Sequence, residues 1–133
     1  SYCVSTSGFK DIFPFKVEWI EDCKYMDAQD KIIDFRYKLA PLVWCRHKAR
    51  VVEYEHNHKF VDRLEQGRLY KFFEHRHYFA QDENDVAKTV ITDEIEFSLG
   101  FGNLVDKTIG IKTLDNTFCK RHKNIIAYFD KQA

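Results

Sequence analysis

The hydrophobic period of this chain changes once, and that change constrains the fold more than any other feature. Over residues 15–99, apolar and polar side chains alternate in short runs rich in aromatic and β-branched residues, which is typical of antiparallel strands. After Gly100-Phe101-Gly102 the period becomes about 3.6 residues, so residues 104–128 are predicted to form one amphipathic helix. A sheet followed by a single long helix predicts an α+β fold.

Six runs carry the strand pattern, and clusters of turn residues separate them. They cover residues 15–21, 31–39, 44–54, 60–62, 69–79 and 86–99. In the third run basic residues alternate with smaller or apolar ones, and we expect Arg46, Lys48 and Arg50 to face solvent. His47, Lys48 and Arg50 are predicted to form a short, wet basic surface.

Size and charge exclude several classes of protein. The chain has 133 residues, few glycines and prolines and no internal repeat, so residues 1–133 are predicted to form a single domain. The 21 basic and 21 acidic side chains cancel, which disfavours nucleic acid as a partner. No apolar run approaches the ~20 residues that span a bilayer, and a signal-peptide pattern is absent. We therefore expect a soluble, cytoplasmic monomer or weak homo-oligomer without stable membrane insertion.

The cysteines and the N-terminus add two further expectations. Cys3, Cys23, Cys45 and Cys119 lie far apart, without the paired spacing of zinc or redox motifs, and are predicted to be reduced. The chain does not begin with methionine, which leaves open an incomplete N-terminal strand or helix.

A series of short motifs lies in the predicted strands and helix. They are Trp44, Phe60-Val61-Asp62, Gly67, Phe73-Glu74-His75-Arg76-His77-Tyr78-Phe79, Asp93-Glu94-Ile95-Glu96-Phe97, Phe101-Gly102, and Phe118 with Arg121. Together they resemble the helix-grip superfamily, which includes START lipid-transfer domains, birch-pollen-allergen-like proteins and polyketide cyclase-like proteins, and above all its small bacterial members. The resemblance covers residues 13–129. It departs from the family pattern at Arg68, where Pro is usual, and at Phe73, which replaces Trp.

The resemblance implies a helix-grip fold, in which a curved antiparallel sheet wraps around the long C-terminal helix. It also implies an internal cavity between sheet and helix that binds a hydrophobic or amphipathic small molecule, such as a lipid or polyketide. Catalysis occurs only in some members.

His75 and His77 are the first candidates for chemistry, because residues i and i+2 of a strand project to the same side. Asp93 lies in the inward register of the next strand, and a hairpin would pair it with the histidines. Three interpretations stay open: a structural polar network, an imidazole that orients a ligand, and acid-base chemistry or a two-His-one-carboxylate metal site. The spacing permits a metal ion but does not require one, so neither a metal nor another cofactor is predicted.

The expected ligand-binding residues extend this cluster with aromatic and apolar side chains. They are Trp19, Phe35, Phe73, His75, His77, Phe79, Ile91, Asp93, Ile95, Phe97, Phe118 and His122. Asp62 is expected to cap the turn at residues 66–67 rather than to enter the cavity. Arg121 is expected to be a solvated helix residue or a salt-bridge partner rather than a ligand anchor.

The leading functional prediction is a binding module for an apolar small molecule. The alternative is a cyclase- or dehydratase-type enzyme that uses His75, His77 and Asp93 for acid-base catalysis. A third hypothesis, an interaction protein that uses the outer face of the sheet, would be favoured by a solid interior.

Overall fold

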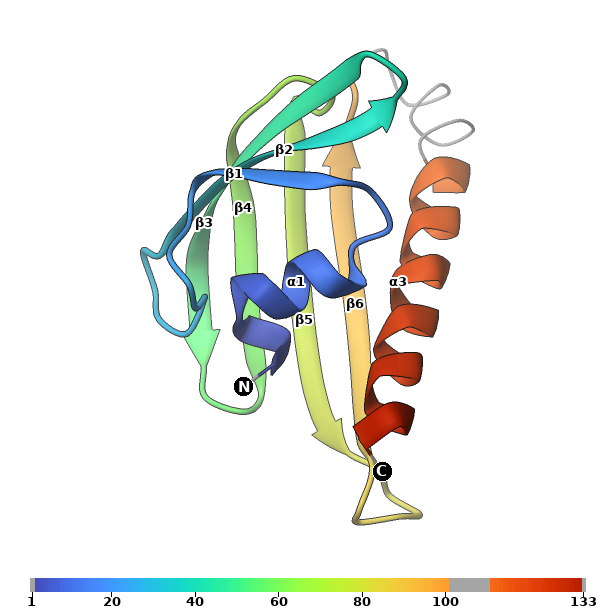
Figure 1. Cartoon of the computed structure of the whole chain (residues 1–133). Coiled ribbons are helices and arrows are strands. Elements are labelled where there is room, and N and C mark those ends of the chain that lie inside the picture. The colour runs from blue at the N-terminus through green and yellow to red at the C-terminus, as the bar shows by residue number, and fades with distance from the viewer. Residues whose placement is uncertain (1, 101–110, 133) are drawn as a thin grey trace.

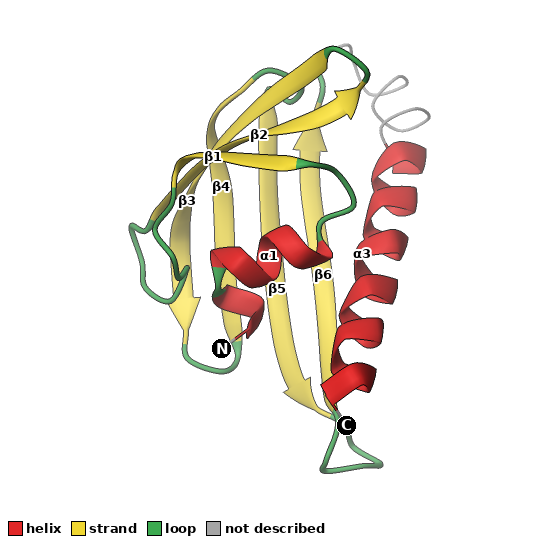
Figure 2. Ribbon diagram, viewed as in Figure 1, coloured by secondary structure: helices red, strands yellow, loops and turns green. Residues whose placement is uncertain are grey.

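The computed structural model describes residues 2–100 and 111–132, which form a curved sheet with helices on one face (Figure 1). Its elements are the 3₁₀ helix η1 (Tyr2–Val4), α1 (Thr6–Ile12), β1 (Val17–Glu21), β2 (Ile32–Ala40), β3 (Val43–Glu55), β4 (Lys59–Gly67), β5 (Phe72–Gln81), β6 (Thr89–Ser98) and α3 (Ile111–Gln132). The predicted α+β class, with an antiparallel sheet before a C-terminal helix, is confirmed (Figure 2).

The sheet is an open antiparallel meander in the order β1-β2-β3-β4-β5-β6. Register shifts interrupt the ladders of β1–β2, β2–β3 and β3–β4, whereas the described ladders of β4–β5 and β5–β6 keep one register. Because such shifts bend strands and increase their twist, curvature is concentrated in the first half of the sheet. Figure 1 shows β1 and β2 crossing steeply over the direction of β5 and β6.

The strand bounds differ from the predicted ones, and the difference is largest at β4. β4 continues to Gly67, although its apolar pattern ends at residue 62. The extension is paired with β3 through the backbone, and its charged side chains form cross-strand ion pairs, such as that of Arg63 with Glu74 on β5 at 2.7 Å. β5 begins at Phe72, later than predicted, and residues 69–71 belong to the connection.

The alternation of β3 separates its two faces. Cys45, His47, Ala49 and Val51 are buried on the helix side of the sheet, while Arg46, Lys48 and Arg50 lie on the other face, partly exposed. The basic residues therefore face outward as predicted. The prediction for His47 was wrong, because residues 45, 47, 49 and 51 share one side of the strand and that side is the core.

The N-terminal helix α1 was not expected from the sequence. It has only seven residues, and Ser5 caps it by accepting a hydrogen bond from the backbone N–H of Gly8 at 3.0 Å. Phe9 of the helix and Phe13, which caps its C-terminal end, pack on Phe35 of β2, with centroid distances of 5.2 and 6.1 Å to its ring. α1 therefore covers part of the sheet face that the longer helix leaves open (Figure 1).

Helix α3 runs alongside β6, with Leu114, Arg121 and Ile125 on its buried face. The side-chain amide of Asn124 donates a hydrogen bond of 3.0 Å to the backbone carbonyl of Ile12, which joins α3 to the end of α1. The predicted helix start at residue 104 and the turn at residues 101–102 lie outside the described residues. Ile126 and Phe129 of the same helix are exposed. No helix in the described ranges has the length and apolar character needed to cross a membrane.

Candidate functional site

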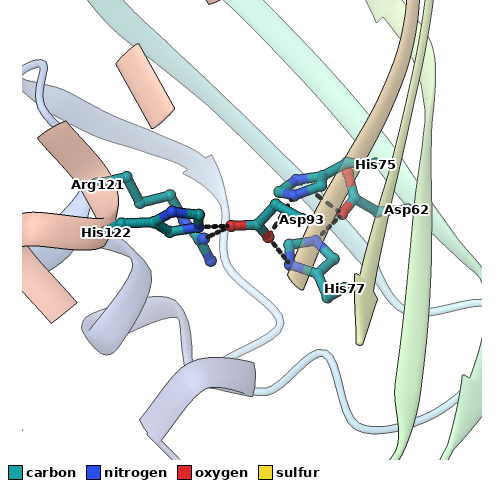
Figure 3. A network of polar contacts seen from close by, with 6 residues as sticks. All are labelled: Asp62, His75, His77, Asp93, Arg121 and His122. Atoms are coloured by element: carbon teal, nitrogen blue, oxygen red, sulfur yellow. Dashed lines mark hydrogen bonds and ion pairs between the residues drawn. The ribbon is translucent and has the colours of Figure 1, made fainter. Parts of the chain in front are cut away.

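Six polar side chains from three strands and one helix converge on the buried side of the sheet (Figure 3). They are Asp62 of β4, His75 and His77 of β5, Asp93 of β6, and Arg121 and His122 of α3. The strand registers explain the meeting, because Asp62 lies opposite His75 and Asp93 lies opposite His77 in adjacent antiparallel ladders.

Asp93 is the centre of this polar network. Its Oδ1 lies 2.7 Å from Nε2 of His75, and its Oδ2 lies 2.6 Å from Nε2 of His122. The guanidinium of Arg121 donates a charge-assisted hydrogen bond to the same Oδ2. With only 2% of its side chain exposed, Asp93 is an ionised group that the protein, rather than water, solvates.

Asp62 forms the second anionic end of the network. Its Oδ2 lies 2.8 Å from Nε2 of His77 and 4.0 Å from Nδ1 of His75. The two imidazoles thus lie between two carboxylates, one on each neighbouring strand. The sequence prediction that Asp62 caps a turn was wrong: Asp62 shares a strand face with Phe60, which is 1% exposed, and both point into the core.

The rings of the two histidines are held by flat contacts. The imidazole of His77 stacks on the ring of Phe60 at a centroid distance of 3.8 Å and an interplanar angle of 10°. The rings of His75 and His77 lie 3.5 Å apart, and Phe118 of α3 packs edge-on against His75 at 5.0 Å. These contacts leave the imidazoles little rotational freedom, so the positions of their nitrogens are well defined.

Burial and pairing shift the pKa values of the network in opposite directions. Burial lowers the pKa of His75 to about 4, and the neighbouring His77 adds to this shift, so the ring is neutral at pH 7. Burial by itself would raise the pKa of Asp93, but the hydrogen bond with His75, the proximity of His77 and the charge of Arg121 outweigh it and lower that pKa. Desolvation would raise the pKa of Asp62, but its hydrogen bond with His77 and its interactions with the charges of His77, His75 and His47 together lower it. Both carboxylates are therefore ionised.

His77 has an unusual environment. While its Nε2 faces Asp62, its Nδ1 lies 3.3 Å from Oδ1 of Asp93 and is the one buried side-chain nitrogen or oxygen without a hydrogen-bond partner among the described residues. A neutral imidazole carries a single N–H and can donate at only one of these nitrogens. In that state the other ring nitrogen faces a carboxylate oxygen with no proton between them.

A small apolar pocket of about 90 Å³ lies next to the network, between the sheet, α1 and α3. Its walls are mostly aromatic and aliphatic, and they include Phe9 and Phe13 of α1 and Leu114 of α3. Asp62, His75, His77 and Arg121 form its charged or ionisable wall, together with His47. The polar network is thus accessible from an apolar space rather than sealed inside the core.

The structure brings some of the predicted ligand-binding residues to this pocket and places others elsewhere. Phe35, Phe73, His75, His77 and Phe118 line it. The remaining residues, which are not among the lining residues of the described chain, are Trp19, Phe79, Ile91, Asp93, Ile95, Phe97 and His122. Asp93 and His122 belong to the polar network behind the wall.

The displaced residues have identifiable surroundings. Phe79 packs on Phe60 at 6.1 Å, toward the end of β5 far from the pocket. Trp19 packs edge-on against Phe35 at 5.6 Å, behind the pocket wall. On β6, Ile91 and Ile95 flank Asp93 on one face of the strand, and both are partly exposed.

Sequence reasoning also missed or misplaced several site residues. Arg121 is 4% exposed and paired with Asp93, so the expectation of a solvated residue was wrong and that of a salt-bridge partner is confirmed. The pocket walls Tyr37 and Tyr70 and the α1 residue Phe9 were not expected at all. Tyr37 alternates with polar residues along β2. This alternation indicates that its side chain lies on the core face of the sheet, but it does not indicate a pocket.

Comparisons with known proteins returned no relative: no family model matches the chain, and neither the curated proteins nor the solved structures hold a significant match. The resemblance to the helix-grip superfamily therefore stays a prediction from the motifs.

Proposed function

We propose that this protein binds a small, largely apolar molecule in the pocket between the sheet, α1 and α3, in the manner of a helix-grip domain. The observation that carries the proposal is an apolar pocket with one charged wall: Phe9, Phe13 and Phe73 supply apolar surface, and Asp62 and His77 supply polar groups. Such sites bind a ligand by apolar burial and orient it with a few polar contacts.

The size of the pocket narrows the ligand class. At about 90 Å³ it is smaller than the roughly 150 Å³ engineered apolar cavity that accepts benzene. The proposed ligand is therefore no larger than a single ring with one hydrogen-bonding group, and a lipid chain or polyketide requires the pocket to widen. A ring that buries about 150 Å² gains roughly 4 kcal/mol. Association costs offset part of this gain, so we expect a Kd above about 1 mM without polar contacts and a lower one with them.

Ligand-observed NMR with single-ring alcohols, amides and carboxylic acids tests the proposal at these affinities. Leu69 lines the pocket, whereas Leu42 is 96% exposed, so Leu69→Trp and the matched Leu42→Trp make the same change inside and outside it. We expect Leu69→Trp to abolish binding and Leu42→Trp to leave it unchanged. Failure of every compound to bind the wild-type protein, or equal binding to both variants, contradicts the proposal.

A second candidate function is acid-base catalysis of the cyclase or dehydratase type. It is favoured by the contact of 2.8 Å between His77 and Asp62, because a carboxylate that orients an imidazole beside a pocket is the usual arrangement of a general base. Both oxygens of Asp93 already contact other groups, so His77 with Asp62 is the better catalytic pair. The substitution His77→Gln is expected to abolish turnover while the variant still shows a thermal unfolding transition. If the wild type shows no turnover and His77→Gln does not fold, the polar network is structural instead.

A further inference from the structure

Three potential metal ligands lie side by side on β4 and β5. One carboxylate oxygen of Asp62 and one ring nitrogen each of His75 and His77 all lie within 4.8 Å of one another, and the three residues are buried (Figure 3). Oδ2 of Asp62 lies 2.8 Å from Nε2 of His77 and 4.0 Å from Nδ1 of His75. Neighbouring strands of a regular ladder fix these positions, so the cluster is preformed.

The spacing suits a tetrahedral metal ion. Zinc binds nitrogen and oxygen ligands at about 2.0–2.2 Å, so two ligand atoms of one tetrahedral ion lie about 3.3 Å apart. The two distances from Asp62, 2.8 and 4.0 Å, fall on either side of that value. Shifts of well under 1 Å, within the reach of side-chain rotations, would bring the atoms to it.

The second nitrogen of each histidine supports the same site. Nε2 of His75 lies 2.7 Å and Nδ1 of His77 lies 3.3 Å from one oxygen of Asp93, so a single carboxylate faces the outer nitrogen of both rings. Metal-bound histidines almost always donate their other N–H to such a group. A metal on Nε2 of His77 places the ring proton on Nδ1, and this nitrogen, unpaired among the described residues, then donates to Asp93.

Charge points in the same direction. Asp62 and Asp93 place two carboxylates in a buried environment, and the guanidinium of Arg121 pairs with Asp93. Buried charge is costly unless it is compensated. A divalent cation bound to Asp62 would supply such compensation.

We propose that Asp62, His75 and His77 bind a divalent transition-metal ion of the zinc class, with Asp93 as the acceptor for both histidines. Two imidazoles and one carboxylate favour zinc, iron(II), cobalt(II) or nickel(II) over magnesium and calcium, which prefer oxygen ligands. All three protein ligands line the pocket, so the remaining coordination position faces it. A site with three protein ligands and one open position is the catalytic rather than the structural type. The metal site does not depend on the small-molecule binding proposed above.

Metal titration of the chelator-treated protein is the first test. Zn²⁺ by calorimetry and Co²⁺ by visible absorption are expected to bind one ion per chain. Asp93→Asn removes the proposed acceptor of both histidines and is expected to weaken metal binding roughly 10- to 100-fold. Asp62→Asn and His75→Gln each remove a metal ligand and are expected to weaken metal binding by a larger factor. His56→Gln and His58→Gln, on the exposed β3–β4 turn, are the matched controls and should leave the affinity unchanged.

Two measurements on the wild-type protein keep the test decisive if a variant does not fold. X-ray absorption of the Zn²⁺ form is expected to show nitrogen and oxygen ligands at about 2.0–2.2 Å and no sulfur, which separates the site from the free cysteines. Long-range ¹H–¹⁵N spectra should shift Nδ1 of His75 and Nε2 of His77 on Zn²⁺ addition, with His56 and His58 unmoved. Absence of stoichiometric binding, sulfur ligation, or shifts confined to the other histidines would overturn the proposal.

Discussion

Arg121 of α3 and Asp93 of β6 form a buried ion pair that joins the C-terminal helix to the last strand of the sheet. The exposed fraction of the Arg121 side chain is 5% and that of Asp93 is 2%, so neither group has water to replace its partner. This pair connects the part of the chain with strand periodicity, residues 15–99, to the part with helix periodicity that follows it. It therefore links the stability of the fold to the geometry of the polar site.

Replacing Arg121 is expected to destabilise the protein strongly. Arg121→Met keeps most of the side-chain volume but leaves Asp93 buried without its cationic partner, which typically costs about 3–5 kcal/mol. Lys123, exposed on the same helix, gives the control Lys123→Met, for which we expect a change within about 0.5 kcal/mol. Urea unfolding followed by circular dichroism measures both, and equal free energies of unfolding would show that the pair contributes little.

Phe60 is expected to be a large contributor to core stability. It is 1% exposed and stacks on the imidazole of His77, so Phe60→Ala leaves a cavity and removes the ring contact, at a cost of about 3–5 kcal/mol. Leu42→Ala, at a position that is 96% exposed, is expected to change the free energy of unfolding by less than about 0.5 kcal/mol. If Phe60→Ala costs no more than this control, the stacked arrangement is not formed in solution.

Alkaline pH is expected to destabilise the fold through Tyr37. Burial raises the pKa of this tyrosine in the folded protein, whereas the unfolded chain releases the proton near pH 10. Above that pH the folded state binds more protons, so the free energy of unfolding falls as pH rises, by up to about 1.4 kcal/mol per pH unit for this group. Between pH 9.5 and 11, Tyr37→Phe should make the free energy of unfolding depend less on pH. Tyr25→Phe, at a half-exposed position, should leave this pH dependence unchanged.

Acid is expected to act on the fold through His47. Burial lowers its pKa below 6.5, although the charges of Asp62 and Asp34 oppose this shift. Below about pH 6.5 the unfolded chain takes up a proton that the folded chain does not, so the free energy of unfolding decreases as pH is lowered. Chemical unfolding between pH 7.5 and 5 gives the slope of the free energy of unfolding against pH. We expect this slope to be smaller for His47→Gln than for the wild type. The control His56→Gln, at an exposed position, should keep the wild-type slope.

The arrangement of the sheet and the faces of its strands followed from local pattern. Alternation along β2 and β6 predicted the core side of each strand, because successive side chains of a strand point in opposite directions. In β3 it predicted the outward basic residues but not the buried position of His47. The same rule placed His75 and His77 on one face, and the rule applied to Phe60 and Asp62 would have placed Asp62 beside them. The error at Asp62 came from weighting turn propensity over strand register.

Only the tertiary structure decided which of these residues meet. The pairing of Arg121 with Asp93, 28 positions apart, depends on how α3 lies against β6, and periodicity defines the face of a helix but not its neighbour. The walls formed by Phe9 and Phe13 depend on α1, a helix too short to produce a periodic signal. Sequence by itself determined the antiparallel strands, the C-terminal helix and most of the inward faces, because these depend on local geometry. The site required the curvature of the sheet and the packing of two helices, which are sums of many long-range contacts.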